Sequence, residues 1–394
     1  MAEEPKDWDL ATRLVRGGLS RSPYGEISEA LYLTQSFAYE SAEAADARFS
    51  GEKPGFIYAR YANPTVAMFE ERLALLEGAE ACRAFASGMA AVHLALMGLL
   101  KAGDHVVAGK ALFGSCRWIL STWAPRFGVD VTFVDAPDVA AWRAAVRPET
   151  RVFFVESPAN PLLEICDIDE ICDLAHAAGA KVVVDNVFAT PIFQSPLRLG
   201  ADVVVYSATK HIDGQGRVLG GALLASAELI EEAYKDPMRH TGPALSPFNA
   251  WLLLKGLETL ELRVRRQSET AAALADRIAD HPKVRACRYP TRSDHPQHTI
   301  AHRQMTGGGS LVAFDLGSKE AAFAFLNALE LVDISNNLGD AKSMATHPST
   351  TTHRSMSEEQ RAEIGLTPGW VRLSAGLESL ADLTRDIDRA LKAA

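Results

Sequence analysis

The chain has few cysteines, and none of them forms a recognisable pair. Its 394 residues include five cysteines with neither a C-x-x-C motif nor a zinc-ligand spacing: Cys82, Cys116, Cys166, Cys172 and Cys287. A scattered, odd-numbered set argues against a disulfide framework and against a structural zinc site. It predicts reduced thiols in a cytoplasmic protein.

Long apolar runs are also missing. The longest stretch extends from Met89 to Leu100 and is interrupted by His93 and Gly98. It is far shorter than the roughly 20 apolar residues that cross a bilayer. Residues 1–7 show neither the apolar core nor the cleavage pattern of a signal peptide. We therefore expect no membrane association.

Positive charge is scarce. The chain has 40 Lys and Arg residues against 50 Asp and Glu residues, which gives a formal net charge of −10, and it has no block of consecutive basic residues. This balance argues against nucleic acid or an anionic membrane as the main partner.

The length of the chain predicts two domains, because 394 residues are too many for one comfortable core. Residues 1–55 are polar and irregular, which favours an N-terminal arm over the main body or over a neighbouring subunit; a disordered tail is the alternative. Residues 56–250 predict a large α/β domain, and residues 251–394 a smaller α+β domain.

In the large domain, short β-branched runs alternate with helical segments. This alternation predicts right-handed crossovers and a mostly parallel sheet. We expect strands at residues 105–108, 131–134, 152–155, 182–185 and 203–206, with an additional edge strand at 220–225. One long helix is expected from 251 to 280, followed by small-domain strands at 284–289, 310–315, 332–336 and 370–374.

Two charged residues follow buried strands that are consecutive along the chain. Asp185 ends the run Val182–Val184, and Lys210 follows Val203–Tyr206 in a turn. Ligands of open α/β folds bind at the carboxyl ends of the strands. A lysine in an apolar cleft can lose its proton near neutral pH and act as a Schiff-base nucleophile. A surface lysine and a structural Asp–Lys pair are the alternatives.

A phosphate site is predicted where Ser87 and Gly88 open an apolar helix at Met89. Backbone N–H groups and the positive end of the helix dipole suit a phosphate there. The hydroxyls of Ser207 and Thr209 and the guanidinium of Arg60 could assist. An ordinary helix N-cap is the alternative.

Arg372 lies between apolar residues in a predicted strand. It could bind a substrate carboxylate through two hydrogen bonds. The alternative is a buried ion pair with Glu378 or another acid. Together, the lysine, the acid, the phosphate site and the carboxylate clamp are the groups that pyridoxal phosphate requires.

Six motifs contain or accompany these residues: Tyr58-Ala-Arg60-Tyr-Ala-Asn-Pro-Thr65, Ser87-Gly-Met-Ala-Ala, Glu156-Ser-Pro-Ala-Asn160-Pro, Val184-Asp185-Asn186, Ser207-Ala-Thr-Lys210-His and Val371-Arg-Leu-Ser-Ala-Gly-Leu-Glu378. In these motifs the chain resembles the cystathionine γ-synthase family of pyridoxal phosphate enzymes, and the resemblance extends over nearly its whole length. It implies the type I, aspartate aminotransferase-like fold, with a mostly parallel central sheet and a smaller C-terminal α+β domain.

The resemblance also implies roles for individual residues. Lys210 would form the Schiff base with the cofactor and move protons, and Asp185 would pair with the pyridine nitrogen. Asn160 would bond the ring hydroxyl, and Arg372 the substrate α-carboxylate. The phosphate would be held by the remaining residues, namely the Gly88 and Met89 backbone, with the Ser87 helix start, Ser207 and Thr209, and by Tyr58 and Arg60 from a neighbouring subunit of a homotetramer.

Departures from the family pattern bear on the reaction. Phe113 stands where many relatives have a tyrosine over the cofactor, so it can stack but has no hydroxyl. Ser115 stands where methionine γ-lyases carry a cysteine, and Asn337 stands for the serine of a later Ser-Leu-Gly motif. The chain looks most like the O-succinylhomoserine sulfhydrylase branch in three places: Phe113, Asn336-Asn337-Leu-Gly-Asp340 and the turn after Lys210.

That branch implies γ-replacement on an O-acylhomoserine by sulfide in methionine biosynthesis. It also implies substrate contacts at Asn337 and Arg372. Cystathionine γ-synthase, O-acetylhomoserine sulfhydrylase and methionine γ-lyase are the nearest alternatives; a non-catalytic binding protein on the same scaffold is a more distant one.

Two further patterns carry no predicted site. His295, His298 and His302 mimic a metal-ligand spacing, but they lie in a polar loop, so no metal site is expected. The tract Gly214–Gly221 lacks the G-x-G-x-x-G spacing and does not open a helix, which argues against a dinucleotide-binding fold.

Overall fold

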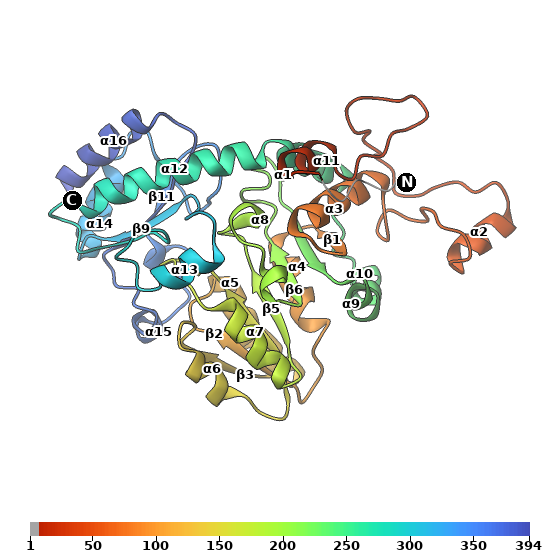
Figure 1. The fold of residues 1–394 in the computed structure, drawn as a ribbon, viewed down its shortest axis with the longest axis horizontal. Helices are drawn as coiled ribbons and strands as arrows, with labels where there is room; N and C mark the ends of the chain where they lie inside the picture. The colour runs from red at the N-terminus through yellow and green to blue at the C-terminus, as the bar shows by residue number, and fades with distance from the viewer. Residues whose placement is uncertain (1–7) are drawn as a thin grey trace.

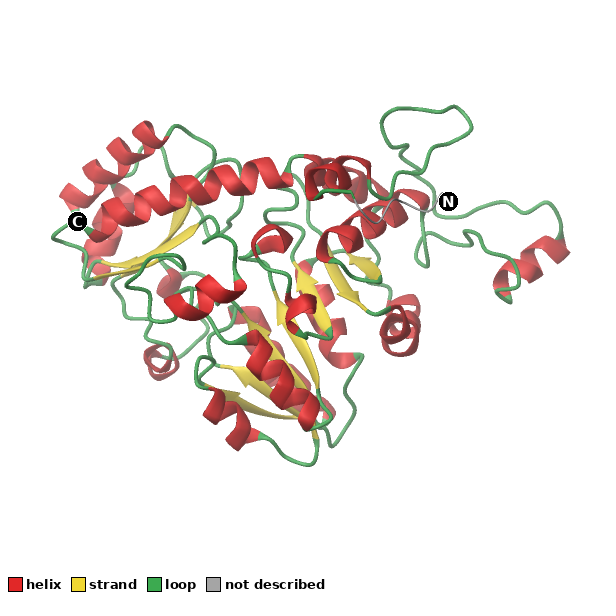
Figure 2. Ribbon diagram, viewed as in Figure 1, coloured by secondary structure: helices red, strands yellow, loops and turns green. Residues whose placement is uncertain are grey.

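A computed structural model describes residues 8–394, and it contains two β-sheets, one in each lobe of an elongated molecule (Figures 1 and 2). The larger sheet has the order β1-β7-β6-β5-β4-β2-β3. Its strands are β1 (Ala81–Phe85), β2 (His105–Gly109), β3 (Asp130–Val134), β4 (Thr150–Glu156), β5 (Lys181–Asp185), β6 (Val203–Tyr206) and β7 (Gly221–Ala225). The five strands expected from β-branched runs are therefore all present.

The sheet is parallel except where β7 enters it. Strands β2 to β6 pair in parallel, whereas β7 runs antiparallel to both β1 and β6. The expectation that 220–225 forms an edge strand is wrong, because β1 covers its outer side. Strand β1 escapes sequence detection because Ala81-Cys-Arg-Ala-Phe lacks a β-branched residue, so its propensity signal is weak.

Alternate residues of the central strands enter two separate cores, one on each face of the sheet. Val184 and Val204 pack on one face, whereas Val183 and Val205 pack on the other. Continuous valine runs suit such strands because both faces are buried.

Helices on the first face are α3 (Pro64–Glu77), α6 (Val139–Ala145), α7 (Ile168–Ala177) and α11 (Pro247–Glu258). Helices on the second face are α4 (Gly88–Met97), α5 (Gly114–Trp118), the π-helical turn η1 (Ile119–Trp123), α9 (Ala227–Leu229), η4 (Ile230–Tyr234) and α10 (Lys235–Thr241). Short turns complete this lobe at η2 (Ala124–Phe127), α8 (Thr190–Phe193) and η3 (Pro196–Leu199).

The second lobe contains a five-stranded sheet of order β10-β11-β12-β9-β8. The strands are β8 (Ala286–Arg288), β9 (Leu311–Asp315), β10 (Asp333–Ile334), β11 (Met344–Thr346) and β12 (Trp370–Ser374). One face packs against α12 (Leu260–Ala279), α14 (Lys319–Asn327) and α16 (Leu380–Ala393). The other face carries Leu311, Ala313 and Trp370, which pack against Leu163 and Phe188 of the larger lobe.

The single helix expected over residues 251–280 is two helices in the structure. α11 ends at Glu258 and α12 begins at Leu260, with Thr259 between them at φ −114°, ψ 8°. The break allows α11 to pack on α3 while α12 covers the small sheet. The apolar period alone did not show it because no glycine or proline marks the break. The domain limits at residues 55 and 250 stay a prediction.

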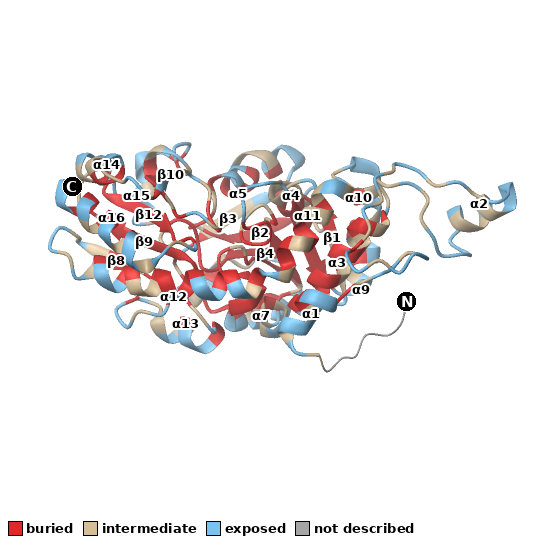
Figure 3. Ribbon diagram, turned by 90° about the horizontal axis from the view of Figure 1, so that it is seen from above, coloured by how far each residue is buried: buried red, intermediate tan, exposed pale blue. Residues whose placement is uncertain are grey.

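The N-terminal segment includes helix α1 (Leu10–Arg16), which packs against α3 and α11. A long segment around α2 (Ala42–Phe49) then extends away from the body (Figures 1 and 3). It carries large apolar side chains that are exposed in a single chain: Tyr24, Ile27, Leu33 and Phe49. The remaining elements are α13 (His298–Gln304), η5 (Pro348–Thr350) and α15 (Glu358–Glu363). Across residues 8–394, no helix has the length and apolar character of a membrane span.

Candidate active site

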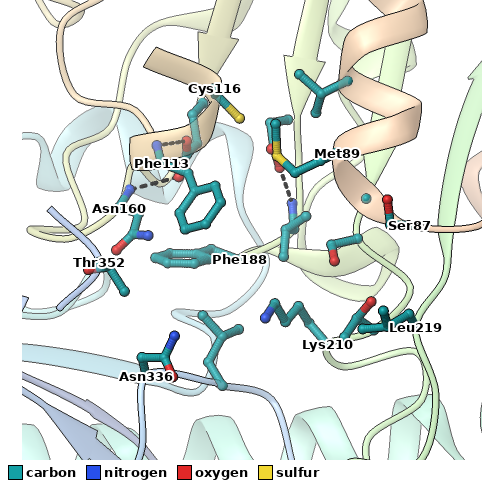
Figure 4. Close-up of a pocket in the computed structure, with 18 of the residues that line it drawn as sticks. Ser87, Met89, Phe113, Cys116, Asn160, Phe188, Lys210, Leu219, Asn336 and Thr352 are labelled. Carbon is teal, nitrogen blue, oxygen red and sulfur yellow. Dashed lines mark hydrogen bonds between the residues drawn. The ribbon is translucent and has the colours of Figure 1, made fainter. Parts of the chain in front are cut away.

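A cavity of about 230 Å³ opens where β4, β5 and β6 end, between the two lobes (Figure 4). Ten of the residues singled out from the sequence line it: Ser87, Gly88, Met89, Phe113, Asn160, Asp185, Ser207, Thr209, Lys210 and Arg372. The parallel topology explains the convergence of those that end or follow β2, β4, β5 and β6, because the carboxyl ends of neighbouring parallel strands meet at one edge. Arg372 comes from β12 of the small sheet, which packs across the cavity.

Lys210 points from the turn after β6 into the middle of the cavity (Figure 4). Its Nζ donates a hydrogen bond to Asn337 Oδ1 at 2.5 Å. Burial, and then the positive charge of Arg372, lower the pKa of Lys210 to about 8. A substantial fraction of the amine is therefore unprotonated near neutral pH, as a nucleophile or a base requires.

Asp185 ends β5 and faces the cavity, where burial raises its pKa to about 6. Its Oδ1 accepts a hydrogen bond from Val187 N at 3.1 Å. Within residues 8–394 no ion pair reaches this carboxylate, so the Asp185–Lys210 pair left open by the sequence is not formed. A buried carboxylate without a cation suits a ligand that carries a proton or a positive charge.

Arg372 lies on β12 and is 2% exposed. Its neighbours Val371 and Leu373 pack on the helix-covered face of the small sheet, so alternation directs Arg372 to the face that meets the larger lobe. Its guanidinium donates to Asn160 Oδ1 at 2.8 Å and to the Asn336 carbonyl at 2.9 Å.

No described carboxylate forms an ion pair with Arg372. The alternative pairing with Glu378 is wrong, because Glu378 instead accepts hydrogen bonds from Ser343 N and Oγ at 2.7 and 2.8 Å. Burial lowers the pKa of Arg372 to about 10, so it stays charged. A buried, charged guanidinium without a carboxylate is complementary to an anionic substrate group.

The helix start at Ser87 has the geometry of an anion site as well as that of an N-cap. Ser87 Oγ accepts the Ala90 N–H at 3.2 Å, which leaves the first N–H groups of α4 without intrahelical partners. A Cβ on Gly88 would lie 2.6 Å from Ser207 Cβ and 2.9 Å from Ser207 Cα, so the close approach requires glycine. No described residue bonds the Ser207 hydroxyl, whereas that of Thr209 bonds the Gly220 N–H and carbonyl.

Sequence reasoning missed several residues of the cavity wall, above all Glu156, the last residue of β4. Glu156 pairs in register with Asp185 and accepts hydrogen bonds from Phe113 N at 2.7 Å and Asn160 N at 2.9 Å. Burial, and then Asp185, raise its pKa well above the usual range. Like Asp185, Glu156 is an acid at the end of a buried strand, so the same sequence pattern predicts it as a site residue.

Asn336 and Leu338 also line the wall and belong to the motif Asn336-Asn337-Leu-Gly-Asp340, but no role was predicted for either. The remaining wall residues gave no signal in the sequence: Val92, Cys116, Val187, Phe188, Leu219 and Thr352. Ser115, which stands where methionine γ-lyases carry a cysteine, is exposed on α5, whereas its neighbour Cys116 lines the cavity. The phenyl ring of Phe113 lies across the cavity from Lys210, near Phe188 (Figure 4).

Tyr58 and Arg60 do not reach the cavity of their own chain. Tyr58 is 39% exposed, and Arg60 donates to the Arg239 carbonyl and stacks on Tyr61, with its Cζ 4.8 Å from the ring centroid. Of the three histidines with a metal-like spacing, His295 is buried and bonded to the Leu163 carbonyl at 3.1 Å. In the described part of the chain, no group of His, Cys, Asp and Glu is placed to hold a metal ion.

Comparison with known proteins shows the family. The family model described as Cys/Met metabolism PLP-dependent enzyme matches residues 11–392. The chain belongs to this family. A member named O-succinylhomoserine sulfhydrylase from Mycobacterium tuberculosis is 55% identical over 98% of this chain and 97% of its own length. A protein of the same name from Pseudomonas aeruginosa is 48% identical over 98% and 99%.

A solved structure supports the fold and the cofactor. The putative O-acetylhomoserine (thiol)-lyase of Campylobacter jejuni superposes with a TM-score of 0.94 at 30% identity, over 98% of this chain and 100% of that one. That structure contains a pyridoxyl-lysine monophosphate. The type I fold and the pyridoxal phosphate dependence expected from the sequence are thus confirmed.

The cavity of this Cys/Met metabolism enzyme fits the cofactor on its own geometry. It combines a lysine of lowered pKa, a buried carboxyl without a cation, and a helix start that only glycine can bring against Ser207. Each feature matches one part of pyridoxal phosphate: the carbonyl carbon, the ring nitrogen and the phosphate.

Proposed function

We propose that this enzyme catalyses γ-replacement on O-succinyl-L-homoserine by sulfide, giving L-homocysteine and succinate in cytoplasmic methionine biosynthesis. The observation that carries the proposal is the agreement of two full-length bacterial relatives in name, at 55% and 48% identity. The site supports the proposal in three ways. Lys210 can act as a base, Arg372 can bind a substrate carboxylate, and Phe113 places a phenyl ring without a hydroxyl in the cavity wall.

The bound cofactor would supply an electron sink, which stabilises the negative charge left when the substrate Cα loses a proton. Every other role falls to the protein. Arg372 would bind the substrate α-carboxylate through the two-pronged guanidinium, while Asn160 and Asn336 keep it oriented. Asp185 would keep the ring nitrogen protonated, because its carboxylate has no other cation to face.

Lys210 would act as the base and acid of the reaction. Its free amine takes the Cα proton, assists loss of a Cβ proton as succinate leaves Cγ, and returns protons after sulfide adds at Cγ. Asn337 Oδ1 lies at hydrogen-bond distance and would hold the amine in the cavity after the substrate has displaced it. Asn337 thus acts on the lysine as well as lying near the substrate.

Phe113 cannot donate a proton to the leaving group. A tyrosine in its place could donate a proton to the departing oxygen, but a phenyl ring cannot. Succinate leaves as a stable carboxylate anion and needs no such proton. This difference favours an acyl ester over methionine, whose thiolate is a poorer leaving group.

We also propose that a neighbouring subunit completes the site in a homotetramer. Tyr58 and Arg60 lie outside the cavity of their own chain, and the segment around α2 that precedes them extends from the body (Figure 3) and carries exposed apolar side chains. Burying such side chains against another copy would be favourable. Arg60 would then reach the phosphate held at α4 of that copy.

The decisive experiment offers O-succinyl- and O-acetyl-L-homoserine, each with sulfide and with cysteine, and identifies the products by mass spectrometry. We expect homocysteine from the succinyl ester and sulfide at the highest kcat/KM. Cystathionine as the main product would identify a cystathionine γ-synthase, and preference for the acetyl ester an O-acetylhomoserine sulfhydrylase. Methanethiol released from methionine alone would identify a γ-lyase, and absence of turnover a binding protein.

A further inference from the structure

A buried network of amide, phenol and carboxyl groups lies directly behind the cavity. Its hydrogen bonds run in one direction. Gln304 Nε2 donates to Gln194 Oε1 at 3.1 Å, and Gln194 Nε2 donates to Asn186 Oδ1 at 2.8 Å. Asn186 Nδ2 donates to the Tyr206 hydroxyl at 2.7 Å, and this hydroxyl donates to Glu77 Oε2. All five side chains are buried.

The network contacts the ends of the three strands that form the floor of the cavity. Gln194 Nε2 also donates to the carbonyl of Ser157, the residue after Glu156, at 2.7 Å. Asn186 follows Asp185, and Tyr206 precedes Ser207. Neighbouring residues of a strand face opposite sides of the sheet. At each of the three strand ends, a residue of the network or its backbone contact (Ser157, Asn186 or Tyr206) is therefore adjacent in the chain to a residue that lines the cavity.

The core contacts confirm this separation of faces. Tyr206 packs in the same core as Val184 and Val204, whereas Val183 and Val205 pack on the cavity side. A one-residue shift of either strand would exchange the two faces. Holding the rear side chains in place thus sets how far the front side chains project into the cavity.

Glu77 gives the network a feature that stability alone does not explain. Its Oε1 has no hydrogen bond of ordinary geometry among the described residues. The Leu197 N–H and the charge of Arg198 act on the carboxyl, but no described lysine or arginine forms an ion pair with it. Burial raises the pKa of Glu77 to about 8, so the carboxyl is neutral at neutral pH. Buried polar atoms without partners are rare and costly, so this arrangement requires an explanation.

We propose that Asn186, Tyr206, Gln194 and Glu77 form a positioning network that fixes Asp185 and Ser207 against the cofactor ring and phosphate. The network is electrically neutral, so it sets the geometry of the strand ends without opposing the charge of Asp185. The inference concerns residues that do not touch substrate or cofactor, and it rests on the proposed placement of Asp185 and Ser207.

The test compares two tyrosine-to-phenylalanine variants that differ only in location. Tyr206→Phe removes the central hydroxyl of the network. Tyr234→Phe removes a hydroxyl that is equally buried but donates to the Ala95 carbonyl at 3.1 Å, away from the cavity. Gln194→Met serves as a second network variant. For each protein we would measure the dissociation constant of pyridoxal phosphate, the visible absorbance of the bound cofactor against pH, and Tm with and without cofactor.

We expect Tyr206→Phe and Gln194→Met to weaken cofactor binding by about 5- to 50-fold and to shift the pH midpoint of the absorbance change. They should also reduce the rise in Tm that the cofactor produces, because tighter binding to the native state gives a larger rise. Tyr234→Phe should lower Tm equally with and without cofactor and leave binding unchanged. If Tyr206→Phe and Gln194→Met behave like Tyr234→Phe, the network is merely structural and the proposal is overturned.

The Asp185→Asn variant tests the placement of Asp185 against the cofactor ring separately from the positioning network. If Asp185→Asn alters cofactor affinity and absorbance while the network variants do not, only the network proposal fails. If Asp185→Asn alters neither property, the placement of Asp185 against the ring is itself wrong.

Discussion

Lys210 Nζ donates a 2.5 Å hydrogen bond to Asn337 Oδ1, and this contact joins the two lobes of the molecule. Lys210 follows the last parallel strand of the large sheet, whereas Asn337 lies between β10 and β11 of the small one. A neutral acceptor can hold the amine without fixing its charge, so the lysine keeps the pKa of about 8 that burial and Arg372 impose.

Asn337→Asp should therefore shift the pH dependence of turnover. A carboxylate at hydrogen-bond distance favours the charged amine, so the pKa of Lys210 rises and less free base is present at a given pH. We expect the acid limb of the kcat profile to move up by about 1 to 2 pH units, with about 10-fold lower kcat at pH 7.5 and recovery at higher pH. Asn327→Asp, on the exposed end of α14, is the control and should leave the profile unchanged. An equal loss of kcat at every pH would contradict the explanation.

Arg372→Lys should weaken substrate binding far more than cofactor binding. A lysine cannot reproduce two parallel hydrogen bonds to a carboxylate, and it leaves Asn160 Oδ1 and the Asn336 carbonyl without their donor. We expect KM for the acylhomoserine to rise by about 30- to 150-fold, which corresponds to about 2–3 kcal/mol for a charge-assisted pair. Steady-state kinetics and a cofactor titration check this, with Arg277→Lys on α12 as control. An unchanged KM would exclude Arg372 as the carboxylate site.

Gly88→Ala should impair cofactor binding in particular. Its Cβ would lie within 2.9 Å of the Ser207 backbone, so the helix start and the turn would have to separate. We expect the dissociation constant of pyridoxal phosphate to rise by about 10-fold or more, a loss near 1.4 kcal/mol. Gly98→Ala, at the other end of α4, would meet the Tyr234 ring at 2.7 Å. It should lower Tm without changing cofactor affinity; equal affinities for both variants would count against a phosphate site at Gly88.

Asp185→Asn should stabilise the apoenzyme and destabilise the holoenzyme at pH 7 to 8. The folded pKa of Asp185 is raised from 3.8 to about 6. The folded apo state therefore binds the proton more tightly than the unfolded state, and stability is lost as pH rises through 6. Removing the ionisable group should restore about 1–3 kcal/mol above pH 6 and nothing below pH 4.

Thermal unfolding of apo and holo forms between pH 4 and pH 8 measures this effect. Asp173→Asn, on the exposed surface of α7, is the matched control and should have little effect at any pH. A destabilised apo Asp185→Asn variant at pH 7.5 would show that the carboxylate has a structural partner rather than a ligand to meet.

Complementation between subunits tests the role of Arg60. Lys210→Ala and Arg60→Ala should each be nearly inactive alone. An equal mixture of the two should regain up to about a quarter of wild-type activity, because about half of the randomly formed pairs are mixed and one of the two sites in each mixed pair has both residues intact. Size-exclusion chromatography with light scattering would confirm that the mixed species assembles. Arg60→Ala that is fully active alone would exclude Arg60 from the phosphate site.

Much of the fold and of the site was predictable because strong local patterns coincide with strand ends. Valine runs mark the buried parallel strands, and Asp185 and Lys210 stand at their carboxyl ends, so their convergence follows from topology. Strand β1 was not predictable because it contains no β-branched residue, and the break at Thr259 was not predictable because no glycine or proline stands at it. Glu156 was assigned no role, although it stands at the end of a buried strand as Asp185 does.

The sequence by itself determined the family, the cofactor and the residues available for chemistry, because each depends on residue type at fixed spacing. Tertiary structure decided which partners those residues have. Lys210 bonds Asn337 and not Asp185, Arg372 bonds two asparagines and not Glu378, and Arg60 faces away from its own cavity. These outcomes depend on how two sheets, far apart in the sequence, pack across the cavity. Local sequence patterns do not indicate such long-range contacts.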